Sequence, residues 1–174
     1  APPGPWQSHP VFEPYVFRWR ERDHMVYAGI NRLMYECLGW AESDDLFAWQ
    51  RCPEPFLDPR DLPWAESDEA RDPGVRACVP CRDPHVLVDG ARCTVYFSAL
   101  ERGSGLPVVG AVTTGDGRRW DDAGVVARGR DGSWDAASLL ESSCVHRLDS
   151  GRWMIAFNTR GKVRYIVGDD RFSF

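Results

Sequence analysis

The 174-residue sequence lacks features that would place it in a membrane or on a nucleic acid. No apolar run approaches the roughly 18–20 residues that a helix needs to cross a bilayer. The formal net charge is −5 and the pI is about 5.4, so there is no basic excess to attract a phosphate backbone. We therefore expect neither a membrane nor a nucleic acid as a partner. A hydrophobic fraction of 43% predicts one globular domain, and the oligomeric state is left open.

The sequence also lacks a second cysteine pair. Six cysteines are present, and Cys78 and Cys81 form a Cys-x-x-Cys motif. A zinc site needs a second pair or histidines at ligand spacing, and a redox motif opens a helix in a βαβ unit. Ordinary thiols are therefore favoured over a metal or catalytic role, and neither a metal nor a cofactor is expected. The even count does not establish disulfides, so the compartment is left open.

Helical periodicity is missing as well. No long stretch keeps a 3.6-residue spacing, and proline and glycine interrupt most candidates. Short runs rich in aromatic and β-branched residues predict strands instead, with polar turns between them. The runs lie at 11–12, 15–19, 25–29, 37–41, 108–113 and 163–167, and the turns at 20–23, 88–90 and 148–151. This pattern predicts an all-β fold built from meanders.

A unit that occurs three times is the most informative feature present. The copies open on Glu13, Asp83 and Glu141, which are 70 and then 58 residues apart, and each continues through a polar turn into a short apolar run. The first two copies close on a glycine followed ten residues later by a tryptophan, at 39–49 and 110–120. A repeat longer than about 40 residues made of short strands is typical of propeller blades. Aligned blades would bring the three carboxyl groups to one axis.

Three motifs carry a resemblance to a known group. The segment 81–86, Cys-Arg-Asp-Pro-His-Val, resembles the Arg-Asp-Pro motif of the five-bladed β-propeller glycoside hydrolases, families 32, 43, 62 and 68. The segment 41–46 followed by Trp49 resembles their blade-ending pattern. Glu141-Ser-Ser-Cys resembles their general-acid motif, although its proline is missing and a cysteine comes two residues late. The resemblance covers nearly the whole chain.

The resemblance implies a partial five-bladed β-propeller with about three consecutive four-stranded antiparallel blades. The approximate blades are 11–52, 81–122 and an incomplete 139–174, with 53–80 as an inter-blade loop. The implied activity is that of a glycosidase acting on a carbohydrate substrate, namely fructosides, arabinosides or xylosides. A non-catalytic carbohydrate-binding propeller is one alternative. A related glycoside phosphorylase is another, but the arginines at 118, 119, 128 and 130 show no clustered phosphate motif.

The same resemblance implies the roles of the site residues. Asp83 would stabilise the transition state and orient the acid, Glu141 would protonate the leaving oxygen, and Arg82 would bind substrate hydroxyls. Glycosidic cleavage needs negative charge near the sugar ring and a proton for the departing oxygen, which suits such a set. Taken singly, Asp83 would be read as a turn residue and Glu141 as a surface acid. Their matching places in the repeat favour the site.

Glu13 departs from the family pattern. It lies one copy before Asp83, whereas the family's first catalytic Asp usually lies about two blades before that motif. We therefore expect Glu13 to be structural and the nucleophile blade to precede Ala1, with the chain truncated at both ends. On this view the isolated chain should hydrolyse glycosides poorly and should tend to associate through unpaired sheet edges.

Other residues have weaker assignments. Trp64 lies in a segment rich in proline and acids, at 53–77, which is equally compatible with a solvated linker and with a pocket rim that touches substrate. His85 follows the Arg-Asp-Pro motif closely and is a candidate for substrate binding, as is His146 after Glu141, although a structural role is favoured for each. Turn hydrogen bonds at blade rims are expected from the aspartates at 44, 45 and 116.

Overall fold

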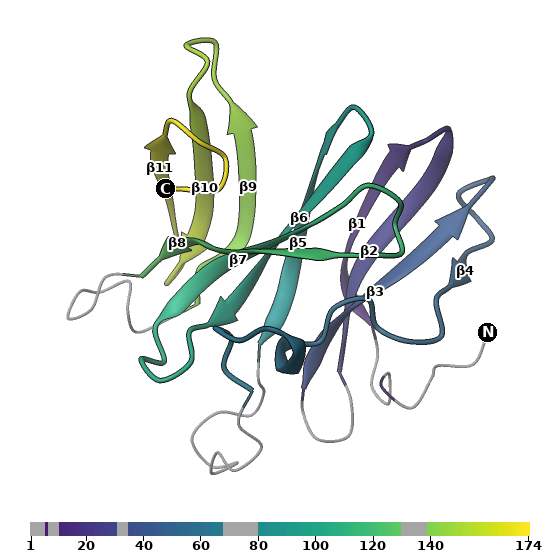
Figure 1. Ribbon diagram of the computed structural model, residues 1–174, viewed down its shortest axis with the longest axis horizontal. Helices are drawn as coiled ribbons and strands as arrows, with labels where there is room; N and C mark the ends of the chain where they lie inside the picture. The colour runs from purple at the N-terminus through teal and green to yellow at the C-terminus, as the bar shows by residue number, and fades with distance from the viewer. Residues whose placement is uncertain (1–5, 7–10, 31–34, 68–79, 130–138) are drawn as a thin grey trace.

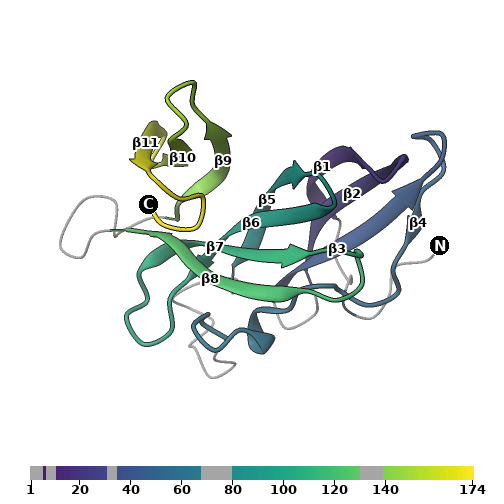
Figure 2. The same ribbon diagram turned by 45° about the horizontal axis from the view of Figure 1, so that its top comes forward.

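In the computed structural model the chain forms three antiparallel sheets, arranged in chain order. The structure describes residues 6, 11–30, 35–67, 80–129 and 139–174. Figures 1 and 2 show the sheets side by side, from the purple and blue first sheet to the yellow-green third one. We call each sheet a blade. No helix among the described residues is long and apolar enough to span a membrane.

Each of the first two blades has four strands in the order in which they occur along the chain. The first blade contains β1 (Phe12–Trp19), β2 (Arg22–Ile30), β3 (Glu36–Ser43) and the short β4 (Gln50–Arg51). The second contains β5 (Cys81–Asp89), β6 (Arg92–Leu100), β7 (Pro107–Thr114) and β8 (Asp121–Arg128). One turn of 3-10 helix, η1 (Pro59–Asp61), lies between them.

The third blade has three strands, β9 (Glu141–Arg147), β10 (Trp153–Thr159) and β11 (Lys162–Gly168), with β10 in the middle. The predictions of an all-β fold and of about three consecutive antiparallel blades are confirmed. The first strands of the three blades are neighbours, because β5 contacts β1 on one side and β9 on the other. Residues at corresponding places on these three inner strands therefore come close together.

Apolar side chains fill the two spaces between blades. Between the first and second blades, Trp19 and Trp40 pack with Val86 and Val95, all nearly inaccessible to solvent. Between the second and third blades the core is formed by Tyr96, Val109, Leu140, Ile155 and Phe157. Burial of such side chains is worth about 1.5–3 kcal/mol each, so the blade interfaces hold the inner strands in fixed positions.

A β-bulge near the start of each inner strand shows which residues of the three repeat copies correspond in the structure. The pairing register shifts between Phe12 and Tyr15 in β1, and between Arg82 and His85 in β5. Within these shifts Glu13 and Asp83 adopt φ values of 55° and 54°.

In β9 the corresponding residue with positive φ is Ser142, at 52°, and not Glu141. Glu141 pairs with Asn158 just before the register shift. It therefore corresponds to Arg82, and the third carboxylate stands one residue before the place that the sequence repeat assigned to it. A β-bulge inserts one extra residue into one strand of a pair. Its position can therefore be seen in the strand pairing but not in the sequence pattern.

The turns that close the first two blades are alike. Ser43 Oγ accepts a hydrogen bond from the Leu46 N–H, and Thr114 Oγ1 accepts one from the Gly117 N–H. Asp45 and Asp116 each accept two further backbone N–H bonds. The predicted turn roles of these two aspartates are confirmed. Asp44 differs, because its carboxylate pairs with Arg22.

Candidate functional site

The guanidinium of Arg82, at the start of β5, is shared by carboxyl groups from three strands. Its Nη2 donates to Glu141 Oε1 of β9 at 2.7 Å, and its Nη1 donates to Glu36 Oε1 of β3 at 3.4 Å. Its Nε lies 4.0 Å from Asp83 Oδ2. One cation thus joins all three blades. We call Glu13, Glu36, Arg82, Asp83 and Glu141 the carboxylate cluster.

The Arg82 cation is maintained by its neighbours. Burial is the largest single influence on the pKa of Arg82 and lowers it, but the carboxyl groups of Glu36, Asp83, Glu141 and Glu13 together outweigh burial and raise this pKa above its ordinary value. Because the planar guanidinium presents five donors in a fixed fork, it can hold several carboxylates at once. Arg82 is therefore the residue that fixes Asp83 and Glu141 relative to each other.

Asp83 and Glu141 differ in access to solvent. The Asp83 side chain is 6% exposed, and its Oδ2 lies 3.2 Å from the hydroxyl of Ser98 on β6. That hydroxyl also hydrogen-bonds the carbonyl of Leu140, just before β9. The Glu141 side chain is 38% exposed. The pair therefore combines a rigidly held, buried carboxyl group with one that a molecule in solution can reach.

Glu13 belongs to this cluster, although the sequence predicts a structural role for it. Its Oε2 accepts a hydrogen bond from the backbone N–H of Asp83 at 2.9 Å. Burial raises the pKa of Glu13 from its ordinary 4.5 to about 7, and the charge of Asp83 and a side-chain hydrogen bond with it add to the rise. The Asp83 N–H and the Arg82 charge oppose this rise. Glu13 therefore keeps its proton in part of the molecules near neutral pH.

Glu36 and Ser98 are members of the site that the sequence reasoning missed. Glu36 is only 1% exposed, and its carboxylate also accepts a hydrogen bond from the Cys81 N–H at 3.3 Å. A charged residue next to the apolar run 37–41 is a usable signal, because a buried carboxylate requires a partner. Ser98 gives no comparable signal, since serine is common in turns and strands alike.

His85 lies between the second and third blades. It is buried, its Nε2 lies 3.4 Å from the carbonyl of Val145, and its ring meets the edge of Tyr15 at 5.1 Å between centroids. Burial lowers the pKa of His85, which favours the neutral ring. The ring of His146 is 6.4 Å away, and its Nε2 is 3.2 Å from Cys144 Sγ. These contacts are packing contacts, and substrate binding by His85 stays a prediction.

Trp64 contacts the second blade. Its ring stacks on Phe97 at 5.9 Å between centroids, and its Nε1 donates to the carboxylate of Asp122 at 3.1 Å. A side chain at Gly110 would collide with the Trp64 ring, so this glycine is needed for the close approach. These contacts do not include the carboxylate cluster, and a substrate contact by Trp64 also stays a prediction.

The cysteines provide no metal site in the described part of the chain. There, no group of three or more His, Cys, Asp or Glu side chains is placed to hold a metal ion. Cys81 is a buried free thiol next to Cys37, and burial raises the pKa of both thiols. Cys78, the other half of the Cys-x-x-Cys motif, lies outside the described residues.

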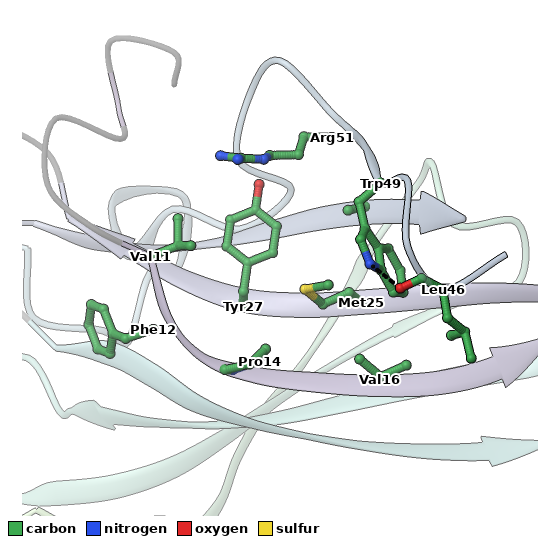
Figure 3. A pocket seen from close by; sticks show the side chains of 10 residues that line it. Val11, Phe12, Pro14, Val16, Met25, Tyr27, Leu46, Trp49 and Arg51 are labelled. Atoms are coloured by element: carbon green, nitrogen blue, oxygen red, sulfur yellow. Dashed lines mark hydrogen bonds between the residues drawn. The ribbon is translucent and has the colours of Figure 1, made fainter. Parts of the chain in front are cut away.

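A separate apolar groove lies on the outer face of the first blade (Figure 3). It has a volume of about 470 Å³, and its lining includes Val16, Met25, Tyr27 and Trp49. Along β1 the lining residues alternate with Tyr15, which contacts His85 of the second blade. The groove and the carboxylate cluster therefore use opposite faces of β1.

Internal symmetry explains the groove. Val86 and Trp120 of the second blade correspond to Val16 and Trp49 of the first, and both are packed against the first blade. Val86 is 6% exposed, and the Trp120 ring lies 5.4 Å from that of Trp40 in β3 between centroids. Val16, in contrast, is 48% exposed. The groove is thus the first blade's equivalent of a blade-to-blade contact surface.

Comparison with known proteins identifies the fold. No protein-family model and no curated protein sequence matches the chain. Solved structures do match. A family-32 β-fructofuranosidase from Bombyx mori is 17% identical, with a TM-score of 0.70 over 94% of this chain and 35% of that one. A thermostable family-43 glycoside hydrolase is 12% identical, with a TM-score of 0.72 over 97% of this chain and 54% of that one.

A family-43 endo-arabinanase from Bacillus licheniformis is 17% identical, with a TM-score of 0.57 over 88% of this chain and 49% of that one. The chain thus has the fold of the propeller glycoside hydrolases of families 32 and 43, and it spans between about a third and a half of the length of these proteins. At such identities the likeness concerns the fold alone.

Proposed function

We propose that the carboxylate cluster is part of the active site of a glycosidase of the five-bladed propeller type. The observation that carries the proposal is the Arg82 bridge, which joins Asp83 and Glu141 from adjacent inner strands. Glycosidic cleavage passes through an oxocarbenium-like state that needs a nearby negative charge and a proton donor. Two carboxyl groups fixed by one guanidinium are a suitable arrangement for that chemistry.

Each residue has a proposed role. Glu141, the more exposed carboxyl group, would protonate the oxygen of the departing group. To do so it must leave its ion pair with Arg82 and take up a proton from solvent, and the freed Arg82 donors would then bind substrate hydroxyls. Asp83 would stay buried beside the sugar ring and stabilise its positive charge. The group that attacks the anomeric carbon or activates water is not assigned to any of the three.

The substrate class is proposed from the proteins with the same fold. The Bombyx mori protein is a β-fructofuranosidase, of which a mutant has been solved in complex with sucrose, and the Bacillus licheniformis protein is an endo-arabinanase. Fructosides and arabinosides are therefore the first substrates to test, with xylosides as the third group. A carbohydrate is the proposed ligand in each case.

Hydrolysis by the full-length gene product tests the proposal. We expect it to cleave at least one aryl arabinofuranoside, aryl xyloside or fructoside, and Glu141→Gln to lower kcat/KM by about 100-fold or more, the usual contribution of a general acid. Asp83→Asn should act in the same direction, whereas Glu54→Gln, at an exposed position, should have no effect. Undiminished turnover in both site variants would refute the assignment.

A further inference from the structure

We infer that two copies of this chain bind head to tail, with the third blade of one copy seated in the groove on the first blade of the other. The surface that would enter the groove is formed by apolar side chains on one side of β10 and β11: Met154, Ala156, Val163, Tyr165 and Val167. We call it the third-blade face. The first and third blades lie at opposite ends of the series of blades (Figure 1), so each copy offers one apolar surface at each end.

The third-blade face occupies positions that are buried in the other two blades. Val163 and Tyr165 are 73% and 69% exposed. Strand pairing, counted from the bulges, gives them counterparts in β3 and β7 that are at most 1% exposed: Leu38, Trp40, Val109 and Ala111. Trp40 contacts Trp120 of the second blade, and Val109 packs in the core between the second and third blades. The equivalent face of each earlier blade is thus covered by the blade that follows it.

The groove occupies the other side of the same kind of contact. Val16 of the groove, like Val86 and Val145, lies three residues after the residue with positive φ in its inner strand. Val86 and Val145 are 6% and 1% exposed because the preceding blade covers them, whereas Val16 is 48% exposed. The first blade therefore exposes the surface that each later blade buries (Figure 3).

The two contacts within the chain show which surface fits the groove. In both, the surface equivalent to the groove is covered by the surface equivalent to the third-blade face. Within one copy the first and third blades flank the second, since β5 contacts both β1 and β9, so a second copy supplies the partner. Removal of both apolar surfaces from water favours the contact.

The contact joins two different surfaces and is therefore heterologous. Such contacts either close into a ring or continue as an open chain of copies. Head-to-tail binding requires no glycosidase activity, so it is independent of the proposed function.

Analytical ultracentrifugation of the 174-residue chain and of two variants tests the inference. We expect the average mass of the wild type to rise with concentration above 19.7 kDa. Val16→Asp blocks the groove, and Tyr165→Asp blocks the third-blade face, so each variant alone should stay near 19.7 kDa. An equal mixture of the two retains one intact groove and one intact third-blade face. The mixture should therefore form a 1:1 complex of about twice 19.7 kDa and nothing larger.

The controls separate this contact from other modes of association. Val88→Asp, at an exposed valine outside both surfaces, should associate as the wild type does. Both blocking substitutions are at exposed positions, and unchanged circular dichroism would verify folding; if Tyr165→Asp does not fold, Val163→Asp takes its place.

Three results would overturn the inference. The first is a wild-type chain that stays monomeric at every concentration. The second is association of Tyr165→Asp alone, which would indicate contact between two grooves or between sheet edges. The third is a mixture of the two variants that stays monomeric.

Discussion

At the scale of single residues, the site depends on charges that compensate one another inside the blade contacts. Glu36 is nearly inaccessible, and its carboxylate faces the guanidinium of Arg82, which is itself three-quarters buried. Glu141 and Asp83 approach the same cation from other directions. A group of this kind is sensitive to removal of one member, because the others are then left in an environment of low polarity.

Arg82→Met tests this dependence on one cation. The change keeps the apolar stem but removes the cation that Glu36, Asp83 and Glu141 share, so we expect a loss of about 3 kcal/mol in the free energy of unfolding, at the lower end of the range for broken buried pairs. The measurement is urea denaturation. Arg152→Met removes an exposed pair with Asp169 and should have little effect. Equal, small losses in both variants would contradict the central role of Arg82.

At the scale of strands and turns, the sequence predicts which segments pair but not the detailed register. The alternating apolar runs, the polar turns and the common Gly-to-Trp interval predicted consecutive meanders correctly. The bulges escaped prediction, because an extra residue in one strand leaves the apolar pattern readable while shifting the side chains that follow it. For that reason Glu141 was aligned with Asp83, although its place is that of Arg82.

The closing turns allow a prediction from equivalent positions. Leu46 and Gly117 both have a positive φ, of 65° and 74°, and only glycine adopts it without cost. Leu46→Gly should therefore raise the free energy of unfolding, by about 0.5–1 kcal/mol.

Gly117→Ala should lower the free energy of unfolding by about 1–2 kcal/mol. Alanine is strained at this positive φ, and its Cβ would lie 3.3 Å from the Trp19 ring. Thermal unfolding of Leu46→Gly and Gly117→Ala measures both changes in stability. Destabilisation by Leu46→Gly would show that the apolar contacts of Leu46 matter more than its backbone strain.

At the scale of the whole molecule, the blades follow one another in chain order, and the first blade has an exposed apolar face. The groove on that face corresponds to the surface that the second blade buries (Figure 3). The chain pattern could predict three blades, but it could not predict this groove, because Val16 and Val86 look alike in the sequence. Only the packing shows that one is exposed and the other covered.

Val16 and Val86 provide a prediction at the scale of the whole molecule. We expect the isolated chain to self-associate through the groove, because removing an exposed apolar surface from water is favourable. Val16→Asp should reduce the concentration dependence of the sedimentation coefficient and leave the melting temperature nearly unchanged.

Val86→Asp, at the buried counterpart, should destabilise the fold by several kcal/mol, since it places a charge in the contact between two blades. Unchanged association in Val16→Asp would exclude the groove as the contact surface.

The most direct test of the central claim is a crystal structure of the full-length Glu141→Gln protein with an uncleaved glycoside. The claim is that the cluster around Arg82 is where sugar binds. We predict that the glycosidic oxygen lies about 3 Å from the side chain of residue 141, within hydrogen-bond reach, with Asp83 beside the sugar ring. A glycoside bound in the groove of Val16, Met25 and Trp49, away from Arg82, would contradict the account.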